Sequence, residues 1–295
     1  MDPLKDSGFL TSQGHGVVGD PQIWQDEYPH VVRYRDATLH FQTALPRHAR
    51  QAIEQLVEQA PAAKRVSAPL PCSASGLFAK REKLDSLKKK WRMQRGNPKR
   101  NGMYDWPIEE LINTREATKR GARVPELIGY GYTSSKLGLM QDFFLIIELL
   151  HDHVDGISKI RTTPQAVNAV IEATFELLHA LQRRGVTHMD LWVANVMLPE
   201  QGKARAIDLE NCFFGHTDYP DETLGFQLGF IYFREIYRYI TEADYDNAVE
   251  RALAKYFPNV GRAGFDRIYA LAKHQEVGRL ERRDIFNNGV LKSRW

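Results

Sequence analysis

The stretch Thr187-His188-Met189-Asp190-Leu191-Trp192-Val193-Ala194-Asn195 decides how the rest of this sequence is interpreted. It follows an amphipathic helical pattern that begins at Thr163-Pro164 and ends at Gly185, residue types that are typical of helix starts and stops. The next segment, Ala206-Ile207-Asp208-Leu209-Glu210, places apolar residues before a carboxylate. The pattern predicts a long helix followed by two loops next to short strands, and each loop presents carboxylate or amide side chains.

The first of these loops resembles the HxDLxxxN catalytic loop of protein-kinase-like enzymes. The resemblance implies that Asp190 accepts or orients the proton of a substrate hydroxyl and that His188 braces the loop. It also implies that Asn195 binds Mg²⁺. Asp208, eighteen positions after Asp190, resembles the aspartate of the DFG motif, which links Mg²⁺ to the phosphates of ATP. The resemblance implies ATP and Mg²⁺ as cofactors, and Mg²⁺ prefers oxygen ligands of this kind.

A lysine upstream of these loops extends the resemblance. Lys80 ends the strand-like segment Leu77-Phe78-Ala79-Lys80 and matches the strand lysine that holds the α- and β-phosphates of ATP. A glutamate on the next predicted helix, residues 108–120, should pair with this lysine. Glu110 is preferred on a spacing that recurs in small atypical kinases, and two glutamates stay open as alternatives: Glu109 and Glu116.

The most convincing buried strand of the sequence covers residues 142–149. It resembles the strand that leads into the hinge between the two lobes of a kinase, where the backbone of Glu148 and Leu150 would bind adenine. No glycine-rich loop stands directly before Lys80, so a substitute cover for the phosphates is expected from Ser73, Ser75 and Gly76.

Two substitutions within the motifs bear on the kind of substrate. Trp192 stands where a protein kinase usually has lysine, so a cation for the γ-phosphate must come from elsewhere. Glu210 replaces the glycine of the DFG motif and is available to assist the metal site. The segment after Asp208 is short and has no APE motif. These departures favour a small, sugar-like acceptor over a protein.

Over residues 76–240 the chain resembles the bacterial lipopolysaccharide core kinases, the heptose and Kdo kinase group with its InaA-type relatives. The resemblance implies an α+β, bilobal protein-kinase-like fold, with a small β-rich lobe at 1–150 and a larger, mainly α-helical lobe at 151–295. It also implies transfer of the γ-phosphate of ATP to a core sugar hydroxyl. Two alternatives are an atypical Ser/Thr protein kinase and a non-catalytic, kinase-like scaffold that binds polyanions.

Composition and charge restrict the setting of the protein. The chain has 295 residues, a net charge of +3 and two cysteines far apart, Cys72 and Cys212, which is typical of a reducing compartment. Neither a signal peptide nor a transmembrane segment is expected, so a cytoplasmic location is predicted. The basic run from Lys80 to Arg100 predicts peripheral contact with the anionic inner membrane or a glycolipid acceptor, rather than nucleic acid. A solvated helix face is the alternative explanation.

Hydrophobic periodicity predicts further elements. Residues 60–75 are expected to form an irregular connection, and residues 80–104 a helix start followed by a loop around Gly96. The other expected elements are strands at 31–35, 37–41 and 124–132, a helix at 46–59, short strands near 186–187 and 206–207, and helices from Thr223 onwards with a capping box at Thr241.

Overall fold

The computed structural model describes residues 26–59, 63–70 and 76–293. The chain divides into two compact units. The first contains the described residues up to Ile112 together with Glu126–Leu149, and the second contains Asn113–Pro125 and the described residues from Leu150 onwards. The expected lobes place Asn113–Pro125 in the first part of the chain, whereas in the structure this segment groups with the second unit.

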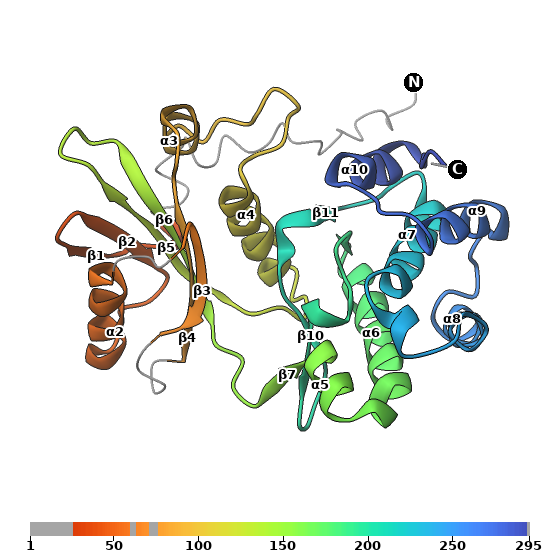
Figure 1. Ribbon diagram of the computed structural model, residues 1–295. Helices are drawn as coiled ribbons and strands as arrows, with labels where there is room; N and C mark the ends of the chain where they lie inside the picture. The colour runs from red at the N-terminus through yellow and green to blue at the C-terminus, as the bar shows by residue number, and fades with distance from the viewer. Residues whose placement is uncertain (1–25, 60–62, 71–75, 294–295) are drawn as a thin grey trace, which may run out of the picture. The chain divides into compact units, whose positions relative to one another are not determined.

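The first unit is built on an antiparallel sheet (Figure 1). Within the described residues this sheet has six strands in the order β1-β2-β5-β6-β4-β3. Their bounds are β1 (His30–Tyr34), β2 (Ala37–Phe41), β5 (Leu127–Ser134), β6 (Met140–Glu148), β4 (Leu77–Lys83) and β3 (Arg65–Pro69). The strand β3 lies in the segment that the sequence predicts to be irregular, and this expectation is wrong. Because β3 is an edge strand with mostly exposed residues, it lacks the alternation that marks a half-buried strand.

Both faces of this sheet are covered, because β6 carries apolar side chains on each face. Phe143, Leu145 and Ile147 face a core shared with the helices α3 (Leu87–Gln94) and α4 (Trp106–Lys119). Phe144 and Ile146 face the opposite core, which includes α2 (Arg47–Glu58). Successive side chains of a strand point to opposite faces, so a continuous apolar run is expected of a strand buried on both. Each such side chain stabilises the fold by about 1.5–3 kcal/mol.

The strand β4 continues beyond Lys80 to Lys83, so the expectation that it ends on Lys80 is wrong. Its two following charged residues are buried and paired. The side chain of Arg81 bonds Asp142 Oδ1 at 3.1 Å, and that of Glu82 pairs with Lys89 at 2.5 Å. Charged side chains are almost never fully buried unless they are paired, so their presence in the sequence indicates a surface loop instead.

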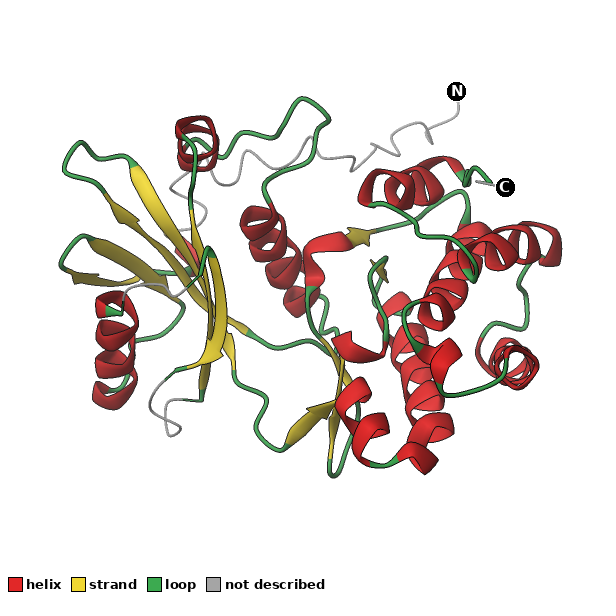
Figure 2. Ribbon diagram, viewed as in Figure 1, coloured by secondary structure: helices red, strands yellow, loops and turns green. Residues whose placement is uncertain are grey.

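The second unit is mainly helical (Figure 2). Its longer helices, within the described residues, are α5 (Gly156–Thr162), α6 (Val167–Gln182), α7 (Pro220–Phe233), α8 (Glu242–Tyr256), α9 (Arg262–Ala272) and α10 (Arg279–Asn288). Its short strands are β7 (His153–Asp155), β8 (Val186–His188), β9 (Val196–Pro199), β10 (Arg205–Ala206) and β11 (Cys212–Phe214). The predicted α+β fold, with a β-rich first part and a mainly α-helical second part, is confirmed.

The core of this unit forms around α6 and α7. The side chains of Phe175 and Leu178 on α6 are 0% exposed. The helix α7 is buried from Thr223 to Tyr232. A Cβ atom on Gly225 would lie 2.5 Å from the carbonyl oxygen of Phe265, so glycine allows α7 and α9 to approach closely. Of the capping box predicted at Thr241, the N-cap bond is confirmed, because the Thr241 hydroxyl accepts a bond from the Asp244 amide at 3.2 Å.

Candidate active site

Backbone hydrogen bonds hold the two acidic loops of the second unit side by side. His188 ends β8, where it pairs with Cys212 on β11. Beyond that pair, the amide of Met189 donates to the carbonyl of Asn211 at 2.8 Å. The amide of Ile207 donates to the carbonyl of Asn195 at 3.0 Å. These bonds fix the catalytic-loop segment against the segment that carries Asp208 and Glu210.

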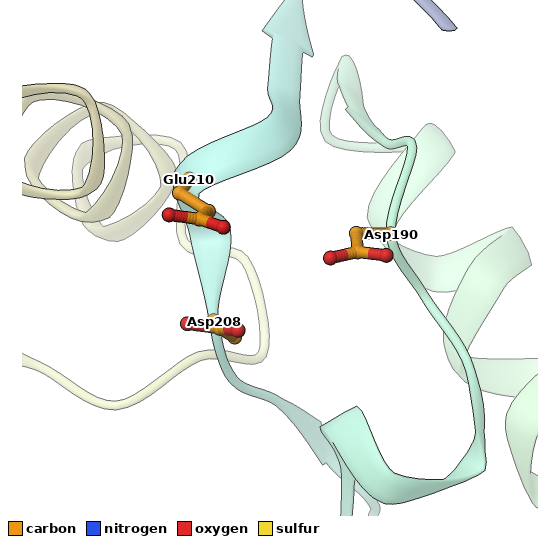
Figure 3. A group of neighbouring side chains, drawn as sticks. All are labelled: Asp190, Asp208 and Glu210. Atoms are coloured by element: carbon orange, nitrogen blue, oxygen red, sulfur yellow. The ribbon is translucent and has the colours of Figure 1, made fainter. Parts of the chain in front are cut away.

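Three carboxylates meet between these loops (Figure 3). Asp190, Asp208 and Glu210 are partly buried, and each offers one oxygen that lies within 4.8 Å of the oxygens of the others. One oxygen of Asp190 points toward the other two side chains. Two negative charges at that distance repel by about 3 kcal/mol at the effective dielectric constant of a protein surface. A cation relieves this repulsion, so the cluster has the electrostatics of a metal site.

The backbone of Asp208 has a left-handed conformation, with φ 65° and ψ 59°. This conformation costs roughly 1–2 kcal/mol for a residue with a side chain, and aspartate is among the residue types that tolerate it best. Strained backbone of this kind clusters at functional sites. At Asp208 it turns the chain into a short 3-10 helix, Leu209–Asn211, whose first turn presents Glu210 beside the other two carboxylates.

Asn195 ends a 3-10 turn that starts at Val193. Its side-chain Nδ2 donates to the backbone carbonyl of Asp190 at 2.9 Å, which holds the catalytic loop closed. With the amide nitrogen used in this way, Oδ1 is the atom that the side chain can offer to a cation. Asn195 therefore serves the loop structurally and retains a suitable metal ligand.

His188 is buried, with 1% of its surface exposed. Its Nδ1 accepts a bond from the Asp190 amide at 3.2 Å, so Nε2 carries the proton and donates to the carbonyl of Ile207 at 3.1 Å. Burial lowers the pKa of His188, although the hydrogen bond to Ile207 opposes this effect. A neutral imidazole with both nitrogens engaged orients the loop and transfers no proton.

The first unit contains the ion pair of Lys80, for which the sequence offers three candidate glutamates. Lys80 on β4 pairs with Glu110 on α4, and both are buried, at 8% and 2% exposure. The alternatives have other structural contacts: Glu109 accepts a bond from the amide of Tyr104, and Glu116 forms an ion pair with Arg120. Glu110 points to the buried face of α4, and this orientation distinguishes it from its neighbours.

The strand β6 ends at Glu148, whose amide donates to the carbonyl of Glu126 at 2.9 Å. The amide of Leu149 donates to the carbonyl of Gly76 at 2.8 Å. An adenine contact from Glu148 would therefore have to use its carbonyl oxygen, and Leu150 would supply an amide. Of the residues expected to cover the phosphates, Ser73 and Ser75 lie outside the described part of the chain.

The structure adds an arginine that the sequence analysis missed. Arg282 on α10 donates from Nη1 to Asp190 Oδ1 at 2.6 Å, across 92 positions of sequence. From the same helix Arg279 donates to the backbone carbonyl of Glu210 at 2.9 Å. No motif links such distant positions, and the one available signal is the spacing of Arg279 and Arg282, which places them on neighbouring turns of one helix face.

The lipopolysaccharide kinase (Kdo/WaaP) family matches residues 78–248, which is more than half of the chain. No curated protein matches it. A solved structure of WaaP in complex with acyl carrier protein has 15% identity and a TM-score of 0.33, covering 77% of this chain and 80% of that chain.

Two further solved structures are similar at the same low level of identity. The bifunctional kinase-methyltransferase WbdD has 15% identity and a TM-score of 0.43, covering 83% of this chain and 54% of that chain. This chain thus spans about half the length of WbdD. The Toxoplasma gondii rhoptry antigen kinase domain has 11% identity and a TM-score of 0.39, covering 85% of this chain and 80% of that chain.

Proposed function

Since this chain belongs to the lipopolysaccharide kinase (Kdo/WaaP) family and is therefore a kinase, we propose that it transfers the γ-phosphate of ATP to a hydroxyl group of a lipopolysaccharide core sugar. The observation that carries the proposal is the cluster of Asp190, Asp208 and Glu210, because it combines a base with cation ligands. All three lie within the matched residues 78–248.

The donor atoms of the cluster fit Mg²⁺. Carboxylate oxygens of Asp208 and Glu210, with the amide oxygen of Asn195, are hard ligands of the kind that Mg²⁺ prefers. When bound there, Mg²⁺ would supply positive charge to the phosphates during transfer. The left-handed backbone of Asp208 supports this role, because the chain accepts a conformational cost to place that carboxylate.

Asp190 is the proposed base. The acceptor hydroxyl oxygen forms a bond to the γ-phosphorus as the bond from that phosphorus to the β–γ bridging oxygen breaks. ADP leaves, and the hydroxyl proton passes to the carboxylate of Asp190. His188 keeps the backbone of Asp190 in place through its bond to the Asp190 amide, and the Asn195 bond to the Asp190 carbonyl does the same from the other side.

Residues of the first unit, with Leu150 from the second, are proposed to hold the nucleotide. Lys80 would bind the α- and β-phosphates, and its buried ion pair with Glu110 fixes the ammonium group before the nucleotide arrives. The carbonyl of Glu148 and the amide of Leu150 would bind adenine. Preorganised charge of this type is worth more than charge that must be ordered during binding.

A short segment favours a sugar over a protein acceptor. Residues 209–219 separate Asp208 from the start of α7 at Pro220, and part of this segment is the strand β11, paired with β8. A protein acceptor needs an extended platform for a peptide, which this segment lacks room to form. Membership of the lipopolysaccharide kinase (Kdo/WaaP) family supports the same choice.

Fewer cations of the basic run, Lys80 to Arg100, are available for a membrane contact than its composition suggests. Five of its cations are paired with carboxylates inside the first unit: Lys80, Arg81, Lys89, Arg92 and Lys99. The face of α3 that remains exposed carries Leu87 and Trp91, at 74% and 56% exposure, one turn apart. Lys88 is exposed beside them, and the guanidinium of Arg95 lies 3.5 Å from the centre of the Trp91 ring.

We propose that this α3 face, defined as Leu87, Lys88, Trp91 and Arg95, contacts the anionic inner leaflet where the acceptor glycolipid lies. Tryptophan is favoured at membrane interfaces, and each basic residue near such a surface contributes about 1 kcal/mol. None of the helices in the described residues is long and apolar enough to cross a bilayer. The enzyme would work at the cytoplasmic side, where ATP is available.

The direct test is incubation of the purified chain with γ-labelled ATP and three acceptor classes: lipopolysaccharide core oligosaccharide, free sugars and protein extract. Label is expected in the core oligosaccharide and is expected to be absent with the Asp190→Asn variant. Label confined to protein would favour an atypical protein kinase. A chain that does not bind ATP at millimolar concentration would be the scaffold alternative.

A further inference from the structure

The catalytic loop lacks the cation that phosphoryl transfer requires near the base. Trp192 occupies the position of the usual lysine, and the loop between Asp190 and Asn195 contains no basic residue. At the same time three carboxylates lie within 4.8 Å of one another, and a triphosphate would bring further negative charge. A positive group from another part of the chain is therefore expected at this place.

Arg282 is held in that place by three contacts. Its Nη1 donates to Asp190 Oδ1 at 2.6 Å, and its Nε donates to the carbonyl of Val277 at 3.1 Å. The guanidinium carbon lies 4.5 Å from the centre of the Phe230 ring, within the range of a cation–π contact. With 11% of the side chain exposed, the charge is oriented before any substrate binds.

The helix that carries Arg282 is anchored to the catalytic loop rather than attached loosely. Ile285 and Phe286 on α10 belong to an apolar core that includes Met189, the residue before Asp190. Phe286 stacks on Phe213 of β11 with ring centres 4.6 Å apart, and the hydroxyl of Thr217 donates to the Phe286 carbonyl at 2.5 Å. Burial of these rings therefore fixes the position of the guanidinium relative to Asp190.

We propose that Arg282 is the positioning residue of the phosphoryl transfer, in place of the lysine that Trp192 replaces. It binds one carboxylate oxygen of Asp190, so that the other faces the acceptor hydroxyl, and it places a permanent positive charge beside the transferred group. The inference rests on the proposed function. It concerns a residue outside the family match, which ends at residue 248.

An arginine suits this role better than a lysine would. Its planar guanidinium bonds a carboxylate and a carbonyl at the same time and stacks on an aromatic face, and it stays charged at every physiological pH. The arrangement around Arg282 uses all of these properties: Asp190, the Val277 carbonyl and the Phe230 ring. A side chain that served only to pack α10 onto the core would not need to bond the proposed base, Asp190.

The test compares Arg282→Met with Arg282→Lys and with Arg283→Met. Methionine keeps an apolar stem over Phe230 and removes the charge, and lysine keeps the charge without the planar fork. Arg283 is the matched control, since it is the next residue on α10 and makes no ion pair or hydrogen bond among the described residues. Melting temperature checks folding in each variant.

For Arg282→Met we expect kcat for transfer to the core sugar to fall about 100-fold or more, as when one preorganised donor is removed from an active site. The KM for ATP should stay within about threefold, because the nucleotide is held by other groups. Arg282→Lys should recover about a tenth of the activity, and Arg283→Met should equal the wild type. An unchanged kcat in a folded Arg282→Met variant would overturn the inference, whether or not the KM for ATP rises.

The same variants are compared in the slow hydrolysis of ATP without acceptor, since water then replaces the sugar hydroxyl. One outcome is that the wild type hydrolyses ATP but labels no core sugar, and that Arg282→Met lowers this hydrolysis. That outcome would contradict the proposed acceptor and support the role of Arg282. If Arg282→Met changes neither transfer nor hydrolysis, the role of Arg282 is contradicted and the proposed function is not. A wild-type chain that neither transfers nor hydrolyses would overturn both.

Discussion

Lys80 and Glu110 form an ion pair that is almost completely enclosed, although 30 positions separate them in the sequence. Such a pair poses a physical question, because taking two charges out of water costs several kcal/mol for each ion, and this cost offsets much of their attraction. An apolar pair of similar volume would often stabilise a fold equally well. The retention of charge at this position is therefore better explained by ligand binding than by stability.

The double variant Lys80→Met/Glu110→Leu separates these two explanations. Its melting temperature should stay close to that of the wild type, because apolar side chains of similar volume replace both members of the buried pair. Its affinity for ATP should fall by about 100-fold or more, measured by calorimetry. A double variant that binds ATP like the wild type would contradict the assignment of Lys80.

The single variant Glu110→Gln should behave differently from the double one. It removes the negative charge with which the buried ammonium group of Lys80 pairs, so the free energy of unfolding should drop by about 3–5 kcal/mol. Glu116→Gln on the same helix is the matched control. Its pair with Arg120 is partly exposed, and losing such a pair costs about 1 kcal/mol or less.

Asp208→Asn should cost activity without costing stability. Asparagine tolerates the left-handed backbone as well as aspartate does, and removing one of three clustered carboxylates relieves repulsion. The melting temperature in the absence of metal should be equal or higher, and kcat should fall at least about 100-fold. The stabilisation that millimolar Mg²⁺ and ATP give to the wild type should be largely lost in this variant. Full retention of that stabilisation would show that Asp208 is not a ligand.

Stability should depend on acid pH through Glu176. Arg123 donates to both oxygens of Glu176 at 2.9 Å, and this bonding lowers the pKa of Glu176 from its ordinary value of 4.5. A carboxyl with a lowered pKa in the folded state stabilises the protein above its unfolded pKa. That contribution is lost as pH falls through the folded value, so the loss occurs below pH 4.5.

The comparison is with Glu176→Gln in chemical unfolding at several pH values. The wild type should be more stable than the variant by about 1 kcal/mol at pH 7, and the two should converge as pH falls below 4.5. Glu172→Gln, at an exposed position on the same helix, should show no such convergence. A difference that persists unchanged at pH 3 would mean that the charge of Glu176 contributes nothing.

The α3 face can be tested on lipid vesicles. Binding to vesicles that contain about 30% phosphatidylglycerol should fall roughly tenfold or more in the Leu87→Ser/Trp91→Ser variant, since both side chains lose apolar burial. Lys88→Gln should weaken binding about fivefold and reduce its dependence on salt. Leu137→Ser is the control, because Leu137 is 96% exposed but lies outside this face. Equal binding by all four proteins would contradict the proposed contact.

Much of the fold follows from local patterns in the sequence. The continuous apolar run of β6 predicts a buried strand, and the helical spacing of apolar residues predicts α2. The order of His188, Asp190 and Asn195 is local as well, since a loop motif needs only neighbouring residues to be recognised. In each case the information that determines the structure lies within a few turns or strands of chain.

The remaining features depend on contacts that no local pattern encodes. The edge strand β3 has no buried face, and the extension of β4 depends on distant partners such as Asp142 for Arg81. The choice of Glu110 among three glutamates depends on which face of α4 is buried. Arg282 reaches Asp190 through the packing of α10, and its pairing follows from tertiary structure alone.

The attachment of α10 to the catalytic loop also has a consequence for when the enzyme becomes active during its synthesis. Arg282 is added 92 residues after Asp190, which at 5–20 residues per second corresponds to roughly 5–20 s of translation. Residue 248, where the family match ends, is added within that interval, so in its last part the chain contains Lys80 and every residue of the family match while Asp190 still lacks its guanidinium partner. With the role proposed for Arg282, a nascent chain would therefore acquire full phosphoryl-transfer activity only as α10 docks, after Lys80 and Asp208 have been made.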